Sequence, residues 1–298
     1  MVTRATRTVE GERRRGNVLR RHFGRKKIAN ITISDISDYV AMRKADGLAP
    51  RSINLDLTFL CSFFKYAIQN GAADHNPARE VDIMKVVKTE KWIPTKEELQ
   101  KFVDCAWETS TGKFFVPWIW FRAYTGTRPS ESVFMEWDDI DFDNDRIHIR
   151  PKPGNELKNG KFRVVDMHPE LKPILLAWRD EWQKIHDRWL HREHAETKRK
   201  KRGVLPGHQW VFINPKRHGE RADCFRRAFY AARQAAGLPQ MTSHTLRHYF
   251  ISQCVMSGIN LFTIAKWVGH ANTLMIEETY GHLNPEYRRE QMAMLKVV

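Results

Sequence analysis

The 298-residue sequence lacks most features of secreted, zinc-stabilised or membrane-spanning proteins. Its four cysteines, Cys61, Cys105, Cys224 and Cys254, lie far apart and form no C-x-x-C pair. A disulfide framework or a zinc ribbon is therefore not expected, and we interpret the cysteines as small core residues in a reducing compartment. No apolar run reaches the ~18–20 residues that cross a bilayer. No apolar stretch follows the basic N-terminus, so a signal peptide is not expected either.

Other motifs are also absent. The sequence has no glycine-rich phosphate loop, no carboxylate cluster suited to Mg²⁺, and no repeat of solenoid period. Acidic residues are few: 35 Asp and Glu face 50 Lys and Arg, which gives a net charge of +15. Such an excess favours an anionic partner, most often nucleic acid. We expect no cofactor, no metal and no membrane partner, and a cytoplasmic, nucleoid-associated location.

The basic residues are concentrated at the N-terminus. Residues 1–30 contain ten Arg or Lys and two Glu, a surplus of eight that is more than half of the net charge. This pattern predicts either a disordered basic arm or a helix that follows DNA phosphates.

Two helices are expected next, over residues 34–46 and 50–71. Ser34 is a candidate cap for the first, and Pro50 is typical of the first turn of the second. Arg51, Ser52 and Asn54 lie at the start of the second helix, away from its apolar stripe. They are candidates for binding a DNA phosphate, although single polar residues at a surface are often only solvated.

Composition divides the chain into residues 1–85, a helical unit, a linker over 86–93, and a second domain over 94–298. The second domain should contain a buried helix over 114–124, and a β-hairpin over 146–150 and 162–167. Further helices are expected from Pro169 and over 222–236, 243–257, 261–268 and 284–295. The stretch 186–203, with K-R-K-K-R at 198–202, is expected to be a charged loop or extension without an assigned role. The predicted fold class is mainly α with a small β-sheet.

Five residues share a chemical theme. Arg128 lies in the turn T-G-T-R-P-S-E-S, His244 and Arg247 share a helix face, His270 follows a glycine, and Tyr280 follows ten residues later. Phosphoryl transfer to a hydroxyl needs a nucleophile, cationic donors around the phosphate oxygens, and an acid for the leaving alkoxide. Arginines and histidines supply such donors, and a tyrosine supplies a nucleophile.

Simpler interpretations exist for each residue. A lone tyrosine is more often a core residue, and Arg128 could simply pair with Glu131. His248 and His282 are interpreted as structural or supporting residues, and Tyr249 and Tyr287 receive no chemistry. A zinc site on His244 and His248, four residues apart, is conceivable, but the glutamate of H-E-x-x-H and a third ligand are missing.

Taken together and in this order, T-G-T-R-P-S-E, H-T-L-R-H, G-H and Y-G-H-L resemble the motifs of the tyrosine recombinases, also called phage integrases. The resemblance covers nearly the whole chain. It implies that Arg128, His244, Arg247 and His270 contact the phosphate, that Glu131 supports Arg128, and that Tyr280 is the nucleophile.

The stretch L-K-N-G-K-F-R-V-V resembles the family's hairpin pattern, which places the general acid on Lys158. The loop is longer than the family's compact versions, so Lys152 and Lys161 remain candidates.

The resemblance also implies the partners. The helical unit before residue 90 resembles the family's core-binding domain, which clamps DNA opposite the catalytic domain, although the first helix often found there is not evident. The expected function is site-specific recombination of double-stranded DNA through a 3′-phosphotyrosine, integrating or excising a mobile element. The family acts as a homotetramer with its C-terminal segment docked in trans, and accessory DNA-bending or directionality proteins are expected. The alternatives are a catalytically silent DNA-binding regulator and a type IB topoisomerase.

Overall fold

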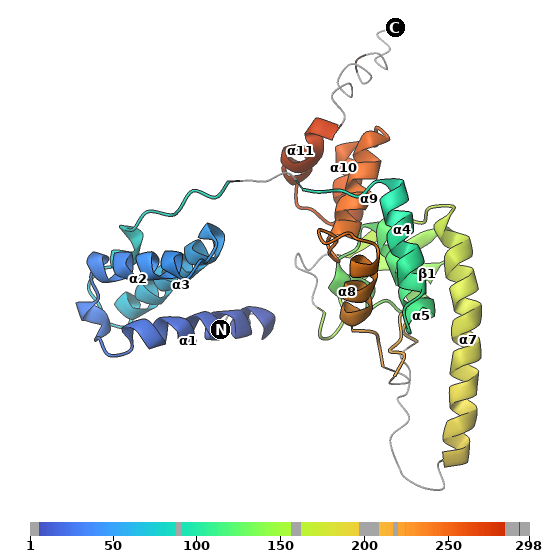
Figure 1. Cartoon of the computed structure of the whole chain (residues 1–298), viewed down its shortest axis with the longest axis horizontal. Helices are drawn as coiled ribbons and strands as arrows, with labels where there is room; N and C mark the ends of the chain where they lie inside the picture. The colour runs from blue at the N-terminus through green and yellow to red at the C-terminus, as the bar shows by residue number, and fades with distance from the viewer. Residues whose placement is uncertain are drawn as a thin grey trace. The chain divides into compact units, whose positions relative to one another are not determined.

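A computed structural model describes residues 6–87, 91–155, 162–196, 209–216, 220–223, 225–283 and 292, with backbone only at 6–8 and 190–196. It divides into two compact units, Met1–Thr89 and Glu90–Val298, each of which is described by itself (Figure 1). Among the described residues, no helix is both long enough and apolar enough to cross a membrane.

The N-terminal unit consists of helices α1 (Thr6–Phe23), α2 (Ile33–Ala45) and α3 (Pro50–Gln69), with single 3-10 turns η1 (Ile28–Asn30) and η2 (Pro77–Arg79). Residues 6–23 of the basic block therefore form a helix, which was one of the two alternatives, and a first helix that was not evident from the sequence is present. Leu19 and Phe23, four residues apart on α1, are buried in the core of this unit. The Phe23 ring lies 5.5 Å from the ring of Tyr39 on α2. Two buried apolar residues thus anchor a helix whose remaining surface is cationic.

Helix α2 begins two residues earlier than predicted. Thr32, not Ser34, is the N-cap: its hydroxyl accepts from the Asp35 N–H, and the Asp35 carboxylate accepts from the Thr32 N–H. This reciprocal pair satisfies two helix-terminal N–H groups, which a cap at Ser34 could not do with the same carboxylate.

The larger unit is mostly helical around a small sheet. Its helices are α4 (Lys96–Trp107), α5 (Gly112–Thr125), α6 (Pro129–Ser132), α7 (Leu171–Glu196), α8 (Arg226–Ala235), α9 (Thr245–Met256), α10 (Leu261–Val268) and α11 (Leu274–Tyr280), with 3-10 turns η3 (Trp137–Asp139) and η4 (Gly281–Leu283). The strands β1 (Ile140–Asp141), β2 (Arg146–Ile149) and β3 (Arg163–Asp166) form an antiparallel sheet in the order β1-β2-β3. The predicted hairpin is confirmed as β2 and β3, with Ile147 opposite Val165.

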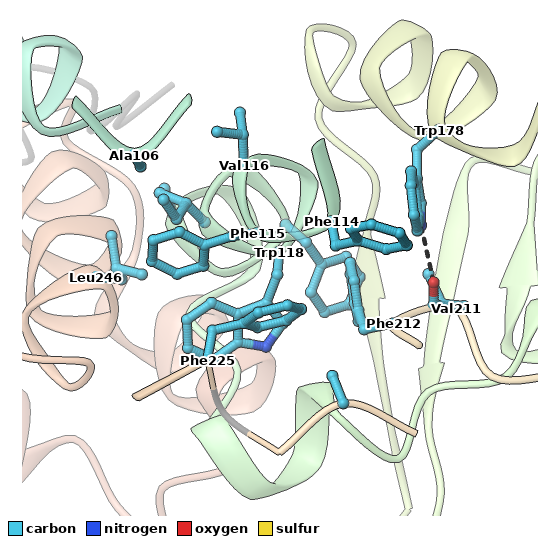
Figure 2. Close-up of a cluster of buried hydrophobic side chains, with 14 of the residues drawn as sticks. Ala106, Phe114, Phe115, Val116, Trp118, Trp178, Val211, Phe212, Phe225 and Leu246 are labelled. Atoms are coloured by element: carbon cyan, nitrogen blue, oxygen red, sulfur yellow. Dashed lines mark hydrogen bonds between the residues drawn. The ribbon is translucent and has the colours of Figure 1, made fainter. Parts of the chain in front are cut away.

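Helix α5 runs through the centre of the core. Its side chains Phe115, Trp118 and Phe121 are fully buried. Figure 2 shows Phe115 and Trp118 directed towards Phe225, whose ring lies 5.4 Å from that of Phe115 and 5.6 Å from that of Trp118. Trp178 of α7 closes the opposite side and donates from Nε1 to the carbonyl of Val211 at 2.8 Å. A helix held on several sides is a rigid support for the turn that follows it.

Helix α7 is longer than its apolar pattern predicts, since it continues to Glu196. Of the two alternatives for this stretch, residues 186–196 are a charged extension of the helix and not a loop, and residues 197–208 lie outside the described part of the chain. The stretch 186–196 contains no glycine or proline, so nothing in it stops a helix.

Helices α9, α10 and α11 build a second apolar cluster beside the main core. Its buried members include Ile251, Val255, Ile264, Ile276 and Tyr280. The helix predicted over 284–295 lies outside the described residues, apart from Met292.

Candidate active site

The turn between α5 and α6 carries the first part of the site. Gly126 ends α5 in the left-handed region at φ 60°, and Arg128 precedes the short helix α6. A Cβ on Gly126 would lie 2.4 Å from Cδ1 of Phe250, which belongs to α9. Only glycine therefore fits both the backbone conformation and the space. Its small size brings α9 directly against the turn.

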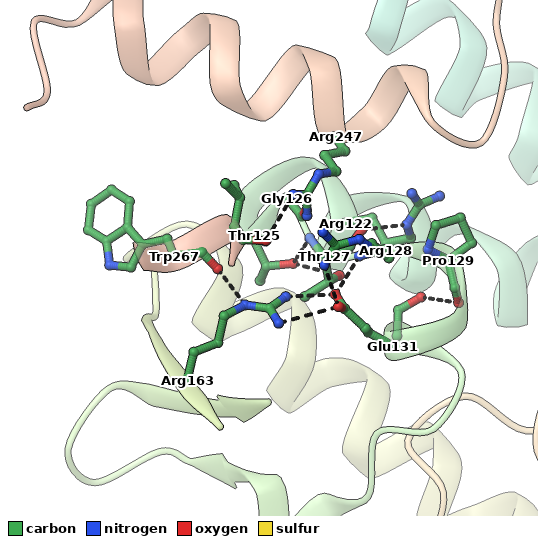
Figure 3. A network of polar contacts seen from close by, with 12 residues as sticks. Arg122, Thr125, Gly126, Thr127, Arg128, Pro129, Glu131, Arg163, Arg247 and Trp267 are labelled. Atoms are coloured by element: carbon green, nitrogen blue, oxygen red, sulfur yellow. Dashed lines mark hydrogen bonds and ion pairs between the residues drawn. The ribbon is translucent and has the colours of Figure 1, made fainter. Parts of the chain in front are cut away.

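Arg247 of α9 joins three segments of the chain. The residue is 6% exposed, and its guanidinium donates from Nη1 to the carbonyl of Gly126 and from Nη2 to that of Val268, both at 2.8 Å. Figure 3 shows this side chain reaching from α9 to the Gly126 turn. Burial, followed by the positive charge of Arg128, lowers the pKa of Arg247 to about 9, so it remains cationic at neutral pH.

Glu131 is the counter-charge of the site. Its buried carboxylate accepts from Arg128 Nη1 at 2.8 Å and from Arg163 Nη2 at 2.6 Å (Figure 3). Burial alone would raise the pKa of Glu131, but the hydrogen bonds and charges of Arg163 and Arg128 lower it to about 2. The structure thus contains the Arg128–Glu131 pair that the sequence suggested, while the Arg128 side chain keeps 24% of its surface exposed.

Sequence reasoning missed Arg163 and Arg122. Arg163 of β3 binds Glu131 and also donates from Nε to the carbonyl of Trp267 at 2.8 Å. The one available signal was its place in the hairpin pattern F-R-V-V. Arg122 is fully buried in α5 and donates from Nε to the Thr127 carbonyl at 3.2 Å. An arginine inside so apolar a helix is itself a signal, because burying a cation is costly.

Two histidines face these arginines. His244 lies at the N-cap position of α9, and burial together with the charges of Arg122 and Arg247 lowers its pKa. His270 follows the end of α10, and burial together with Arg247 and Arg128 lowers its pKa to about 4. Its Nδ1 is buried and has no hydrogen-bond partner within the described ranges. Both pKa values favour neutral rings at pH 7, as expected beside permanent cations.

Tyr280 is the last residue of α11 and is 2% exposed. Its hydroxyl is hydrogen-bonded to Nδ1 of His248, on α9 next to Arg247. Burial raises the pKa of Tyr280 to about 12, against the opposing positive charge of Arg247. The phenol is therefore covered, but its oxygen faces an imidazole rather than apolar atoms.

Of the three candidate lysines, Lys152 alone lies among the described residues. Lys158 and Lys161 lie outside the described residues. Lys152 is described, and its Nζ lies 2.6 Å from Glu136 Oε2 and 2.5 Å from Asp139 Oδ2. With a side chain only 13% exposed, Lys152 is held in an ion-pair network at the base of the hairpin.

The candidate DNA contacts of the N-terminal unit also differ. Arg51 and Ser52 are exposed at the start of α3. Asn54 instead donates to the carbonyl of Met84 at 2.8 Å and accepts from its N–H at 2.9 Å. Its amide therefore holds the segment after η2 against α3.

Within the described part of the chain, no group of three His, Cys, Asp or Glu side chains could hold a metal ion. Among the described residues, the site instead brings Arg128, Arg163 and Arg247 near the carboxylate of Glu131, with Arg122 buried against the Thr127 carbonyl. An excess of partly buried positive charge is costly until an anion enters. Such a site is suited to stabilise the charge that develops on phosphate oxygens during transfer.

Two protein-family models match this chain. Residues 95–287 match the Phage integrase family, and residues 4–71 match the phage integrase N-terminal SAM-like domain. IntQ of Escherichia coli (strain K12), which is named as a defective protein, is 26% identical over 274 residues, or 87% of this chain. The chain spans 66% of the length of that relative.

Solved structures share the fold. The Tn1549 transposon integrase in complex with transposon right end DNA superposes with a TM-score of 0.75 at 20% identity, over 99% of this chain and 95% of that one. A lambda integrase tetramer bound to a Holliday junction gives a TM-score of 0.70 at 18% identity, over 93% of this chain and 72% of that one.

Proposed function

Because the chain belongs to the phage integrase family, whose tyrosine recombinases break and rejoin DNA, we propose that it cleaves DNA through a 3′-phosphotyrosine bond to Tyr280. One observation carries the proposal. Arg247 donates hydrogen bonds to the turn before Arg128 and to the end of the helix before His270. Its positive charge also lowers the pKa of Tyr280, against the effect of burial. The motifs that are dispersed from residue 126 to residue 280 thus share one arginine.

In the proposed reaction, Arg128, Arg247, His244 and His270 contact the non-bridging oxygens of the scissile phosphate. Glu131 and Arg163 keep Arg128 in place. Permanent arginine charges stabilise the transition state, so the proposal assigns no metal and no cofactor.

The covalent step exchanges one phosphoester for another. The Tyr280 oxygen bonds to phosphorus, the bond to the 5′-oxygen breaks, and the leaving oxygen takes a proton from a lysine. We assign that acid to Lys158, which matches the family's hairpin pattern, with Lys161 as the alternative, because Lys152 is committed to Glu136 and Asp139. The 5′-hydroxyl of a second strand then reverses the step, and no nucleotide is needed because the phosphotyrosine conserves the bond energy.

The proposed partner is double-stranded DNA that carries specific recombination sites. We propose that residues 1–85 and 94–298, joined by the linker 86–93, hold the duplex between them, with Arg51 and Ser52 on its phosphates. The lambda integrase tetramer bound to a Holliday junction supports a homotetramer on DNA. We further propose that the segment after residue 283 docks in trans. We also propose that accessory DNA-bending or directionality proteins take part. The enzyme would act on nucleoid DNA in the cytoplasm and would integrate or excise a mobile element.

The test is covalent trapping on nicked suicide duplexes cut from the DNA that flanks the gene. Wild-type protein should give an adduct that survives SDS. Tyr280→Phe should bind the same DNA with unchanged affinity and give no adduct, whereas the control Tyr249→Phe should still give it. Adducts that persist in Tyr280→Phe would show that the nucleophile lies elsewhere. Relaxation of a supercoiled plasmid that lacks these sites would instead indicate a type IB topoisomerase.

A further inference from the structure

The contact between His248 and Tyr280 is not used by the proposed mechanism. His248 follows Arg247 on α9, and Tyr280 ends α11, 32 residues later. The phenolic oxygen is hydrogen-bonded to Nδ1 of the imidazole, and the two ring centroids are 6.0 Å apart. The family motif directs His244, Arg247 and His270 to the phosphate, which leaves His248 without a role.

Both groups of this hydrogen bond are neutral at pH 7. Burial, followed by the charges of Lys91, His244 and Arg247, lowers the pKa of His248 to about 4, so the ring is neutral at pH 7. Burial raises the pKa of Tyr280 to about 12, so the phenol keeps its proton. The direction of the bond then depends on the ring tautomer: when the ring proton is on Nε2, the phenol donates to Nδ1, and this is the arrangement that proton transfer to Nδ1 requires.

A neutral phenol is a weak nucleophile. Even at an ordinary phenol pKa of about 10, only about one molecule in a thousand is ionised at pH 7. A group that removes the proton while the new bond forms therefore accelerates attack.

We propose that His248 is the proton acceptor for Tyr280 during strand cleavage. As the phenolic oxygen bonds to phosphorus, its proton passes to Nδ1 of His248. The bond from phosphorus to the 5′-oxygen breaks, and that oxygen takes a proton from the lysine of the site. In religation a 5′-hydroxyl attacks phosphorus and loses its proton to the lysine, while the departing phenolate regains its proton from His248. This inference rests on the proposed function.

The charged groups around His248 explain why the basicity of its Nδ1 should rise when DNA binds. Lys91, Arg247, His244 and His270 face it, and all of them are cationic or become so on protonation. They oppose a charge on His248 in the free protein. A bound phosphate adds the opposite charge, and the transition state adds more, so the basicity of Nδ1 rises when the substrate is present.

The first test is His248→Asn, because the amide oxygen of asparagine can accept the phenol hydrogen bond near the position of Nδ1 but cannot take the proton. Adduct formation on the nicked suicide substrate is measured in single turnover from pH 5.5 to 9.5. We expect a fall of about 10²–10³-fold at pH 7, with DNA affinity within about twofold of wild type. The acidic limb of the wild-type profile, which is the fall in rate as His248 becomes protonated, should be replaced by a rate that rises with pH over the whole range, because the rate then follows phenol ionisation.

The matched control is His282→Asn, two residues after Tyr280 and exposed. It should keep both the rate and the acidic limb. His244→Asn tests the rival base, and it should slow cleavage through the phosphate without removing the limb.

A second measurement replaces Tyr280 by 3-fluorotyrosine, whose phenol is more acidic. In wild-type protein the acidic limb should stay in place, because it reports on His248, and this test holds even if His248→Asn does not fold. In His248→Asn the fluorinated phenol should restore much of the lost rate at pH 7.

Three results would overturn the proposal. His248→Asn could cleave as fast as wild type or faster, which would show that the contact only holds the tyrosine in a resting position before cleavage. The acidic limb could be lost in His244→Asn instead, or it could move with the fluorinated phenol. If wild-type protein forms no adduct at all, the proposed function itself fails, and that result is distinct from these three.

Discussion

The arginines of α1 and those around Glu131 have the same chemistry but opposite surroundings. On α1, Arg13, Arg14, Arg20 and Arg21 are exposed, whereas Arg122 and Arg247 of the larger unit are buried. An exposed cation keeps its hydration and can follow any phosphate at little cost. A buried cation must be fixed by carbonyls and carboxylates, as Arg247 is by Gly126 and Val268. The number of charges therefore indicates the class of partner, and their burial indicates where chemistry takes place.

The largest effect that this comparison predicts is on catalysis by Arg247. Arg247→Lys keeps the charge but loses the planar fork that binds two carbonyls and presents the remaining face to phosphate. Covalent adduct formation should fall by about 10³-fold or more, measured in single turnover on the suicide substrate. The control Arg14→Lys on α1 should leave the rate unchanged. A loss of less than tenfold at Arg247 would remove the distinction between the two regions.

The next effect is on stability. Arg163→Met leaves the buried Glu131 with Arg128 alone, and the free energy of unfolding should fall by about 3 kcal/mol in urea titrations. Adding Glu131→Gln to that variant should recover part of the loss, because the unpaired buried charge is then removed. Lys184→Met, at an exposed position of α7, serves as the control and should have no measurable effect. Equal losses in the single and double variants would contradict the ion-pair explanation.

A smaller effect concerns pH. The pKa values of His270 and His248 are lowered to about 4, from about 6.5 in an unfolded chain. Between these values the unfolded chain binds more protons, so stability is complete above about pH 6.5 and falls as the pH decreases towards 4. Glu131, with a pKa of about 2, contributes to this loss only below about pH 4.5.

The urea midpoint measured from pH 7.5 to 4.5 should therefore decrease towards acid. His270→Gln should flatten the curve, whereas His282→Gln, at an exposed position, should not. A midpoint independent of pH would show that the two rings have the same pKa in the folded protein as in the unfolded chain.

The smallest effect belongs to the exposed side of the comparison. The double variant Arg13→Gln/Arg14→Gln should keep its urea midpoint and lose DNA affinity. The slope of log affinity against log salt should fall by up to about 2, because each phosphate contact contributes about 0.9. Lys184→Gln on α7 should leave the slope unchanged, and a lower midpoint in the double variant would mean that these arginines also stabilise the fold.

Local patterns made part of this structure predictable. The helix expected over 261–268 is α10 with the same bounds, because an apolar period and a terminal glycine define it within one short stretch. The hairpin of β2 and β3 followed from two β-rich runs around turn residues. Arg128 and Glu131 were paired in advance because they lie three residues apart around a short helix.

Contacts between distant segments were not predictable in this way. Arg163 reaches Glu131 across 32 residues, and nothing in the strand sequence indicates which acid it meets. His248 was interpreted as a supporting residue, because its hydrogen bond to Tyr280 arises only from the packing of α11 on α9, which the sequence does not reveal. Ser34 was predicted as the cap of α2, whereas the Asp35 carboxylate pairs with Thr32.

The close fit of Gly126 against Phe250 restricts how this protein can change. Any side chain at position 126 would overlap the Phe250 ring, and a smaller residue at 250 would relieve the overlap but not the left-handed backbone. Neither position can therefore be improved by stepwise substitution, and a mutant library that seeks new target specificity should hold both constant and vary residues elsewhere.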